Sequence, residues 1–249
     1  MAETTALRFI ETISPNDQML VEDRRQQYFR WGLSAISYLD GVRALSGAPR
    51  EPRTILDVPC GYGRVLRMFK ARYPDAELTA CDADPDAVAF CGSTFGVRTI
   101  VSPGPPEQLD LERRYDLIWV GSLFSHLDRP TWRSFLRVFT RHLEPGGLLA
   151  ITTNGRTIAR ESRRGRTAWP GALPDSEALY ETFARDGFAY QSFPASRDYG
   201  ISLSLPSVLC MEVEQVPGLA VRAATEAGWN DRQDIVVAQR EDDPVSVAV

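Results

Sequence analysis

The segment Ile55–Arg64 reads ILDVPCGYGR, and it decides the fold that we expect for this chain. Its apolar beginning predicts a buried strand, and Asp57 stands at the end of that strand. Glycines follow at positions 61 and 63, where a sharp turn can use the positive φ angles that glycine adopts without strain. A strand, a glycine-bearing turn and a helix are typical of the first unit of a parallel α/β sheet.

Strands and helices alternate along the next hundred residues. Further apolar runs predict strands at 77–81, 97–101, 115–120 and 148–153, and segments with helical periodicity lie between them. Short apolar strands that alternate with helices indicate a parallel sheet covered on both faces. We therefore predict an α/β, doubly wound fold.

The two ends of the chain extend this core. Residues 17–46 predict a helix, and we interpret 1–49 as an N-terminal helical cover of a single domain spanning 1–249. The Gly-, Arg- and Pro-rich stretch 155–174 predicts an irregular loop, and it opens an insertion over 155–205. The other expected elements are a helix at 175–186, β-prone pieces at 188–193 and 199–205, a helix at 207–216 and an antiparallel hairpin at about 220–239.

The composition argues against several classes of protein. A net charge of −5 disfavours a surface that wraps nucleic acid, so no nucleic-acid partner is expected. The four cysteines form no CxxC pair and have no histidine at metal-ligand spacing, so neither disulfides nor a metal are expected. No stretch approaches the roughly 18 apolar residues of a membrane span, and the N-terminus lacks the pattern of a secretion signal. We expect a cytoplasmic protein without membrane contact, and its oligomeric state stays open.

A second acid follows at the end of the second predicted strand. Asp82 lies nineteen residues after Gly63, and a carboxylate has two acceptor oxygens that can bind both hydroxyls of a ribose. A dinucleotide fingerprint would require a third glycine, but Leu66 stands at that position, which disfavours NAD. The pattern therefore predicts a nucleoside site without a pyrophosphate cradle.

Over roughly residues 50–154 the chain resembles the class I S-adenosylmethionine-dependent methyltransferases. The segments LDVPCGYG, CDAD, YDLIWVGSLFSHL and LEPGGLLAIT match the motifs of that family in order and spacing. The resemblance implies a seven-stranded Rossmann-like sheet with an antiparallel C-terminal hairpin, S-adenosylmethionine as cofactor, and methyl transfer. Two positions depart from the family: Pro59 replaces its usual first glycine, and the stretch 103–109 lacks its usual acid after the third strand.

The resemblance also assigns roles at the first two motifs. Asp57 would hold the amino group of the methionine moiety, and the backbone at Gly61 and Gly63 would pass beneath the cofactor. Asp82 would bind the ribose, with Ala83 beside the adenine. An acid at a strand end is also a common helix cap or turn residue, and that structural role stays open for both carboxylates. The turn residues Pro59 and Cys60 complete the expected cofactor loop.

The remaining cofactor contacts are implied farther along the chain. Glu107 or Gln108 would contact the adenine amino group in place of the missing acid. Ser122 and Leu123 would flank the methionine end. Tyr28, in the N-terminal helix, would cover the cofactor from above, and plain packing is its alternative role.

His126 is the candidate catalytic residue. It lies just beyond the fourth predicted strand, where the resemblance implies the acceptor side, and a neutral hydroxyl acceptor benefits from a general base. A structural histidine is the alternative. The other histidine, His142, stands at a predicted helix end, where interaction with the helix dipole is expected.

The insertion is expected to determine specificity. Arg156 opens its arginine-rich start, and Tyr190 and Tyr199 are expected to face the acceptor. The arginines are interpreted either as a solvated loop or as a lid that meets an anionic acceptor. As part of that lid, 156–170 would be mobile or exposed. A looser resemblance of the C-terminal half, to methyltransferases that accompany glycosyltransferases, points to a sugar or another hydroxylated small molecule.

We therefore expect methylation of a small molecule at a hydroxyl group. The alternatives are a non-methylating transferase, such as an aminopropyltransferase, and a cofactor-binding module that has lost its chemistry. Extra acids near the fourth strand would favour the former, and GSLFSHL lacks them. The intact Asp57, Gly61, Gly63 and Asp82 argue against the latter.

Overall fold

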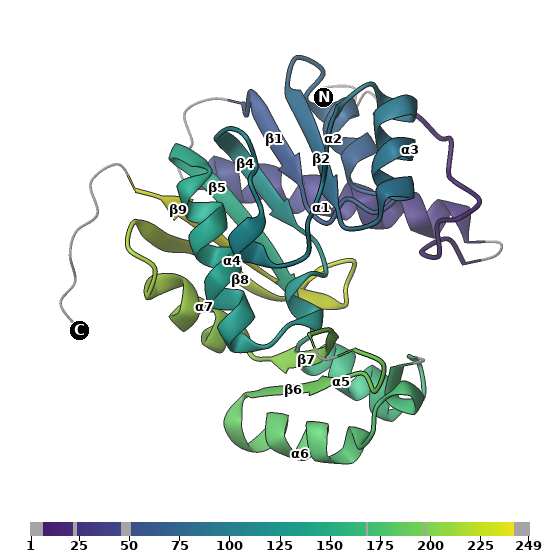
Figure 1. Ribbon diagram of the computed structural model, residues 1–249, viewed down its shortest axis with the longest axis vertical. Helices are drawn as coiled ribbons and strands as arrows, with labels where there is room; N and C mark the ends of the chain where they lie inside the picture. Colours follow the sequence, from purple (N-terminus) through teal and green to yellow (C-terminus); the bar gives the residue numbers. More distant parts are fainter. Residues whose placement is uncertain (1–6, 22–23, 46–50, 168, 197, 242–249) are drawn as a thin grey trace, which may run out of the picture.

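A seven-stranded sheet forms the centre of the protein (Figure 1). The computed structural model describes residues 7–21, 24–45, 51–167, 169–196 and 198–241. The strands of the sheet are β1 (Thr54–Asp57), β2 (Glu77–Asp82), β3 (Arg98–Val101), β4 (Tyr115–Val120), β5 (Leu143–Thr153), β8 (Leu219–Trp229) and β9 (Gln233–Arg240). Their order is β3-β2-β1-β4-β5-β9-β8, with β9 antiparallel to both β5 and β8 and the other pairs parallel. The predicted Rossmann-like sheet with its antiparallel hairpin is confirmed.

Helices cover both faces of this sheet. They are α1 (Arg25–Leu45), α2 (Leu66–Arg72), α3 (Pro85–Phe95), α4 (Arg129–Arg141) and α7 (Pro206–Glu214). Two further helices, α5 (Arg156–Arg163) and α6 (Ser176–Asp186), lie outside these two layers. Helices α1 to α3 share one apolar cluster with Ile55, whereas α4 and α7 share another with Leu56. Adjacent residues of a strand point to opposite faces, so strands buried on both sides need the unbroken apolar runs seen in the sequence.

The segment from 155 to 205 builds a layer of its own, which Figure 1 shows below the main sheet. It contains α5, α6 and the antiparallel pair β6 (Phe188–Ser192) and β7 (Gly200–Ser204). Its apolar core consists of Ile158, Ala159, Leu173, Leu179, Tyr180, Phe183, Ala189, Ile201 and Leu203. Hydrogen bonds from this layer to the loop after β4 hold it against the sheet, since the Ser202 hydroxyl donates to the Leu127 carbonyl.

Three predicted boundaries are wrong. The first helix begins at Arg25 instead of 17, because Asp17 accepts a hydrogen bond from the Met19 N–H (2.9 Å) and closes a turn there; its predicted end near 47 lies outside the described residues. Residues 156–163 form a helix, not an irregular loop, because Ile158 and neighbouring residues bury one face. Strand β5 begins at Leu143, before the Gly-rich turn, and its register with β4 shifts there.

No helix of the described ranges is long and apolar enough to cross a bilayer.

A buried carboxyl group fixes the start of β9. Asp234 accepts a hydrogen bond from the Ala227 N–H through Oδ1 (2.8 Å), while Oδ2 has no partner among the described residues. Burial raises the pKa of Asp234 to about 6. Because this pKa lies above that of an unfolded chain, the protonated group stabilises the fold at low pH. That stabilisation is lost as the pH rises through about 6.

The variant Asp234→Asn keeps the acceptor for Ala227 and cannot ionise. Between pH 5 and pH 7.5 its free energy of unfolding is expected to fall about 1–2 kcal/mol less than that of the wild type. Urea unfolding at the two pH values measures this difference. Asp231→Asn, at an exposed position of the turn between β8 and β9, is the control and should show the same change in unfolding free energy as the wild type. Equal pH dependence of Asp234→Asn and wild type would contradict the assignment.

Candidate active site

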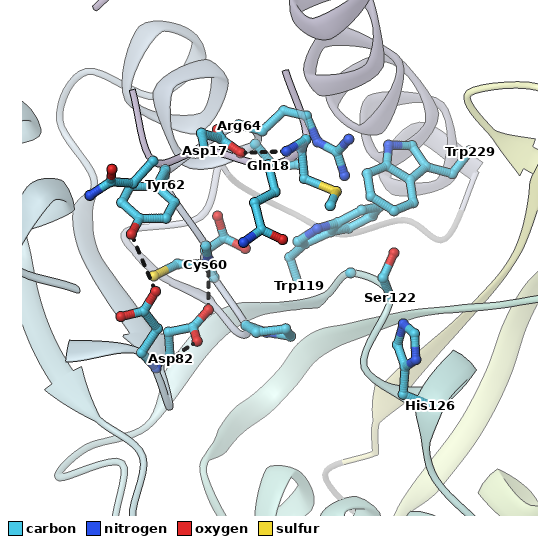
Figure 2. Close-up of a pocket in the computed structure, with 18 of the residues that line it drawn as sticks. Asp17, Gln18, Cys60, Tyr62, Arg64, Asp82, Trp119, Ser122, His126 and Trp229 are labelled. Carbon is cyan, nitrogen blue, oxygen red and sulfur yellow. Dashed lines mark hydrogen bonds between the residues drawn. The ribbon is translucent and has the colours of Figure 1, made fainter. Parts of the chain in front are cut away.

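The carboxyl ends of β1, β2 and β4 surround a cavity of about 740 Å³, which we call the central cavity (Figure 2). A second cavity of about 800 Å³ adjoins it between the loops after β2, β3 and β4. A third, of about 320 Å³, lies between the loop after β4, α5 and the β8–β9 turn. Asp82, Ser122 and Tyr199 line the first two cavities, and Ser122 and His126 line the first and third. Parallel strands end at one edge of a sheet, which explains why these separate motifs meet.

The turn after β1 forms the floor of the central cavity. Gly61 and Gly63 have φ angles of +47° and +78°. A Cβ atom at Gly63 would lie 2.4 Å from the ring of Phe95, so only glycine fits between this turn and α3. Pro59 and Cys60 line the cavity beside Gly61, and the Cys60 N–H donates to the Cys81 carbonyl (2.9 Å). The turn is thereby tied to β2.

Asp57 contributes a buried carboxylate to this cavity. Its Oδ2 has no hydrogen-bond partner among the described residues. Burial raises the pKa of Asp57 well above its usual range, Asp82 raises it further, and Arg64 lowers it. A buried acceptor without a partner is costly, and a ligand cation at this point would supply the missing donor and favour the charged form. The Asp57 carboxylate is therefore suited to bind the ammonium group of a ligand.

Asp82 connects the end of β2 to the glycine turn. Its Oδ2 accepts from the Gly61 N–H (2.7 Å), and its Oδ1 accepts from the Asp84 N–H (3.0 Å). Each carboxylate oxygen accepts about two hydrogen bonds, so both oxygens retain capacity for a diol. Ala83 follows on the second cavity. Asp82, the residue predicted to bind the ribose, therefore lies at the boundary between the two large cavities.

Arg64 is a site residue that the sequence analysis missed. Its guanidinium lies 5.4 Å from the ring centre of Trp31 and 5.0 Å from that of Trp229, and it lines the central cavity. Burial lowers its pKa, and no acid of the described chain lies within ion-pair distance. Its place directly after the glycine turn was the available signal, but the flanking tryptophans come from α1 and β8.

Tyr28 lies outside the cavity linings, contrary to its predicted role as a cover. Its side chain is buried, and its hydroxyl donates to Asp17 Oδ2 (2.6 Å). The segment Pro15–Met19 lines the cavity instead, and Figure 2 shows Gln18 reaching toward its middle. Tyr28 therefore anchors this segment through Asp17 without lining the cavity itself.

Glu107 and Gln108 also lie away from the cavities. Both are exposed on a short helical turn, η1 (Pro106–Gln108), and a hydrogen bond with Ser134 lowers the pKa of Glu107. Other residues of this loop line the second cavity instead: Ser102, Gly104, Pro105 and Pro106. Leu123 and Phe135 line the same cavity. The turn directs the two polar side chains toward α4 and solvent.

The loop after β4 brings His126 to the central cavity. Nδ1 of His126 lies 2.8 Å from the Gly200 carbonyl, so Nδ1 carries the hydrogen of the neutral ring and Nε2 is left as an acceptor. The ring stacks on Tyr199 with centres 4.6 Å apart. Burial lowers the pKa of His126. The Ser122 hydroxyl donates to Gln233 (3.0 Å), which holds the same loop against β9.

The predicted substrate residues separate in space. Tyr199 lines both large cavities. Tyr190 lies opposite Ser202 on the small hairpin formed by β6 and β7, and it lines none of the three cavities. Arg156 pairs with Glu226 outside the cavities. The expectation that 156–170 is mobile or exposed is wrong for the inner face of α5, where Ile158, Ala159 and Ser162 are buried.

Comparison with known proteins finds similar methyltransferases. A methyltransferase-domain family model matches residues 55–147. Over 157 residues the chain is 34% identical to a trans-aconitate 2-methyltransferase of Streptomyces avermitilis, covering 56% of this chain and 55% of the relative. A malonyl-[acyl-carrier protein] O-methyltransferase of Anoxybacillus flavithermus is 32% identical over 108 residues, 43% of this chain and 41% of that protein. The chain thus matches about half, or less, of the length of these curated relatives.

Solved structures share the fold at low sequence identity. The S-adenosylmethionine-bound amino pentose methyltransferase CalS10 of Micromonospora echinaspora has a TM-score of 0.56 at 19% identity, covering 89% of this chain and 98% of that one. DesVI of Streptomyces venezuelae has a TM-score of 0.55 at 19% identity, covering 84% and 91%. The family model and the shared fold agree with the resemblance to methyltransferases. Residues 55–147 therefore match a methyltransferase-domain family, and the chain has the fold of the class I S-adenosylmethionine-dependent methyltransferases.

Proposed function

We propose that this protein transfers a methyl group from S-adenosylmethionine to a hydroxyl oxygen of a small molecule, with His126 as general base. One observation carries the proposal: the Asp57, Arg64 and Asp82 side chains and His126, whose Nε2 has no hydrogen-bond partner among the described residues, line one cavity. A site for a nucleoside with a charged amino-acid tail therefore adjoins a proton acceptor.

The residues present fit the cofactor. Asp57 would accept hydrogen bonds from the ammonium of the methionine moiety, and Arg64 would donate to its carboxylate. Asp82 would accept from the ribose hydroxyls on the lone pairs that Gly61 and Asp84 leave open. The opposite charges of Asp57 and Arg64 at one cavity match a zwitterion. Neither the buried Asp57 nor the half-buried Arg64 has a hydrogen-bonded partner of opposite charge in the described chain.

His126 would accept the proton of the hydroxyl. The Gly200 carbonyl orients the ring and keeps the hydrogen on Nδ1, so that Nε2 presents its lone pair. Burial lowers the pKa of His126, which keeps the ring neutral at neutral pH. Bound S-adenosylmethionine supplies a methyl group already activated on a sulfonium. The protein's contribution is therefore alignment and removal of one proton.

The names of the similar proteins support a small acceptor. The curated relatives are named for trans-aconitate and for a malonyl group on a carrier protein, and one solved neighbour for an amino pentose. The third cavity, which adjoins the central cavity at Ser122 and His126, has a volume of about 320 Å³ and suits a small molecule. The insertion over 155–205 would supply one wall of this acceptor site.

Cofactor binding tests the first half of the proposal. Calorimetry with S-adenosylhomocysteine should show saturable binding, and Asp82→Ala should weaken it by about 1.5–3 kcal/mol, because a charged acceptor is lost. Asp86→Ala removes an exposed acid of α3 outside the cavities and is the matched control. Unchanged affinity in folded Asp82→Ala would remove Asp82 from the site, and absence of binding to the wild type would overturn the proposed function.

A further inference from the structure

We propose that the methyl acceptor carries an oxyanion, either a carboxylate or a phosphate, and that the third cavity binds this group through Arg166 and Arg232. The inference rests on the proposed function and names the class of its substrate. We call this third cavity the acceptor cavity from here on.

The acceptor cavity lies where the rest of an acceptor has to go. It shares Ser122 and His126 with the central cavity, so a molecule whose hydroxyl reaches Nε2 of His126 extends into it. Its far side comes from the loop after α5 and from the β8–β9 turn, which carry Arg166 and Arg232. The two arginines therefore face the non-reacting part of the molecule.

The formally charged residues that line this cavity are all arginines. They are Arg64, Arg166 and Arg232, and no aspartate or glutamate of the described chain lines it. Arg232 donates to Glu161 through Nε (2.8 Å), which leaves its other N–H groups free to bind a ligand. Arg166 forms no ion pair with a described residue and is exposed at the rim. Guanidinium groups with free donors at a partly enclosed surface favour a carboxylate or phosphate.

Other arginines of the insertion do not share this arrangement. Arg156 pairs with Glu226, and Arg163 pairs with Glu177; neither lines the acceptor cavity. Their charge is compensated at the surface. In the acceptor cavity Glu161 compensates Arg232, whereas Arg166 forms no ion pair with a described residue. The geometry thus selects Arg166 from a run of arginines that looks uniform in sequence.

The remaining wall of the cavity is apolar and aromatic. Trp31, Trp169 and Trp229 line it, together with Ile158 and Ile201. Such a wall packs against a carbon skeleton, and the tryptophans report on its occupancy by fluorescence. A small organic anion fits this combination of basic and aromatic side chains better than a neutral polyol.

The test is a fluorescence titration of the full chain saturated with S-adenosylhomocysteine. The probes are L-malate, glycerol 3-phosphate and glycerol at constant ionic strength. At least one of the two anions should give a saturable change, whereas glycerol should give none. Arg166→Gln and Arg232→Gln should each weaken anion binding about tenfold, the effect of losing one charged hydrogen bond. Arg164→Gln, an exposed arginine outside the cavity, should leave it unchanged.

The outcomes are distinguishable. A response to malate alone assigns a carboxylate, a response to glycerol 3-phosphate alone assigns a phosphate, and a response to both supports the shared chemistry. No saturable response to either anion, an equal response to glycerol, or anion binding unchanged in Arg166→Gln and Arg232→Gln would overturn the inference. If S-adenosylhomocysteine binds and the anions do not, only the substrate class fails. If S-adenosylhomocysteine itself does not bind, the proposed function fails.

Discussion

Replacing His126 by alanine is expected to lower the rate of methyl transfer about 10²–10⁴-fold, the contribution of a positioned general base. The variant loses the Nε2 acceptor, whereas the residues proposed for the cofactor, Asp57, Arg64 and Asp82, stay in place. Affinity for S-adenosylhomocysteine should therefore remain nearly constant. Single-turnover rates with labelled S-adenosylmethionine, beside calorimetry, separate the two quantities.

The pH profile gives an independent measurement of the same role. A base must be unprotonated, so activity should fall as the pH decreases through the pKa of His126. Burial lowers that pKa, so this acid limb should lie below the ordinary histidine value of about 6.5. His126→Ala should lose the limb. His142→Ala, at the end of α4 and outside the cavities, is the matched control. A loss of less than about fivefold in His126→Ala would leave catalysis to positioning alone.

Replacing Gly63 by alanine is expected to lower the free energy of unfolding by about 2–5 kcal/mol. The φ angle of +78° costs an alanine about 1–2 kcal/mol. The added Cβ would also lie 2.4 Å from the Phe95 ring, and overpacking of this kind costs about 1–3 kcal/mol. Because the turn carries the floor of the central cavity, binding of S-adenosylhomocysteine should weaken as well.

Gly61→Ala is the matched control for this effect. Its φ angle is +47°, and a Cβ atom there meets no described atom within 4 Å, so only the backbone cost of about 1–2 kcal/mol applies. Urea unfolding of both variants gives the comparison. Equal destabilisation of the two would mean that the contact with Phe95 relaxes freely and that α3 does not constrain the turn.

The local sequence was sufficient to predict the sheet and the site residues at the ends of its first two strands. Unbroken apolar runs predict strands buried on both faces, and parallel strands end at one edge, so Asp57 and Asp82 could be brought together without coordinates. Gly61 and Gly63 could be recognised because a positive φ is a property of a single residue. Each of these inferences depends on a pattern within a few residues.

Only the tertiary structure decided the positions of other residues around the site. Arg64 acquires its place from Trp31 and Trp229, which lie 33 positions before it and 165 after it in the sequence. Tyr28 was predicted at the cofactor, but its hydroxyl binds Asp17 instead.

The arginines show the same limit. Arg156 and Arg166 look alike in sequence, yet Glu226 compensates the first, and the second lines the acceptor cavity. Their difference follows from partners contributed by distant elements. The local sequence determines which conformations a segment prefers, whereas the neighbours of a charged side chain are determined by how the packed elements meet.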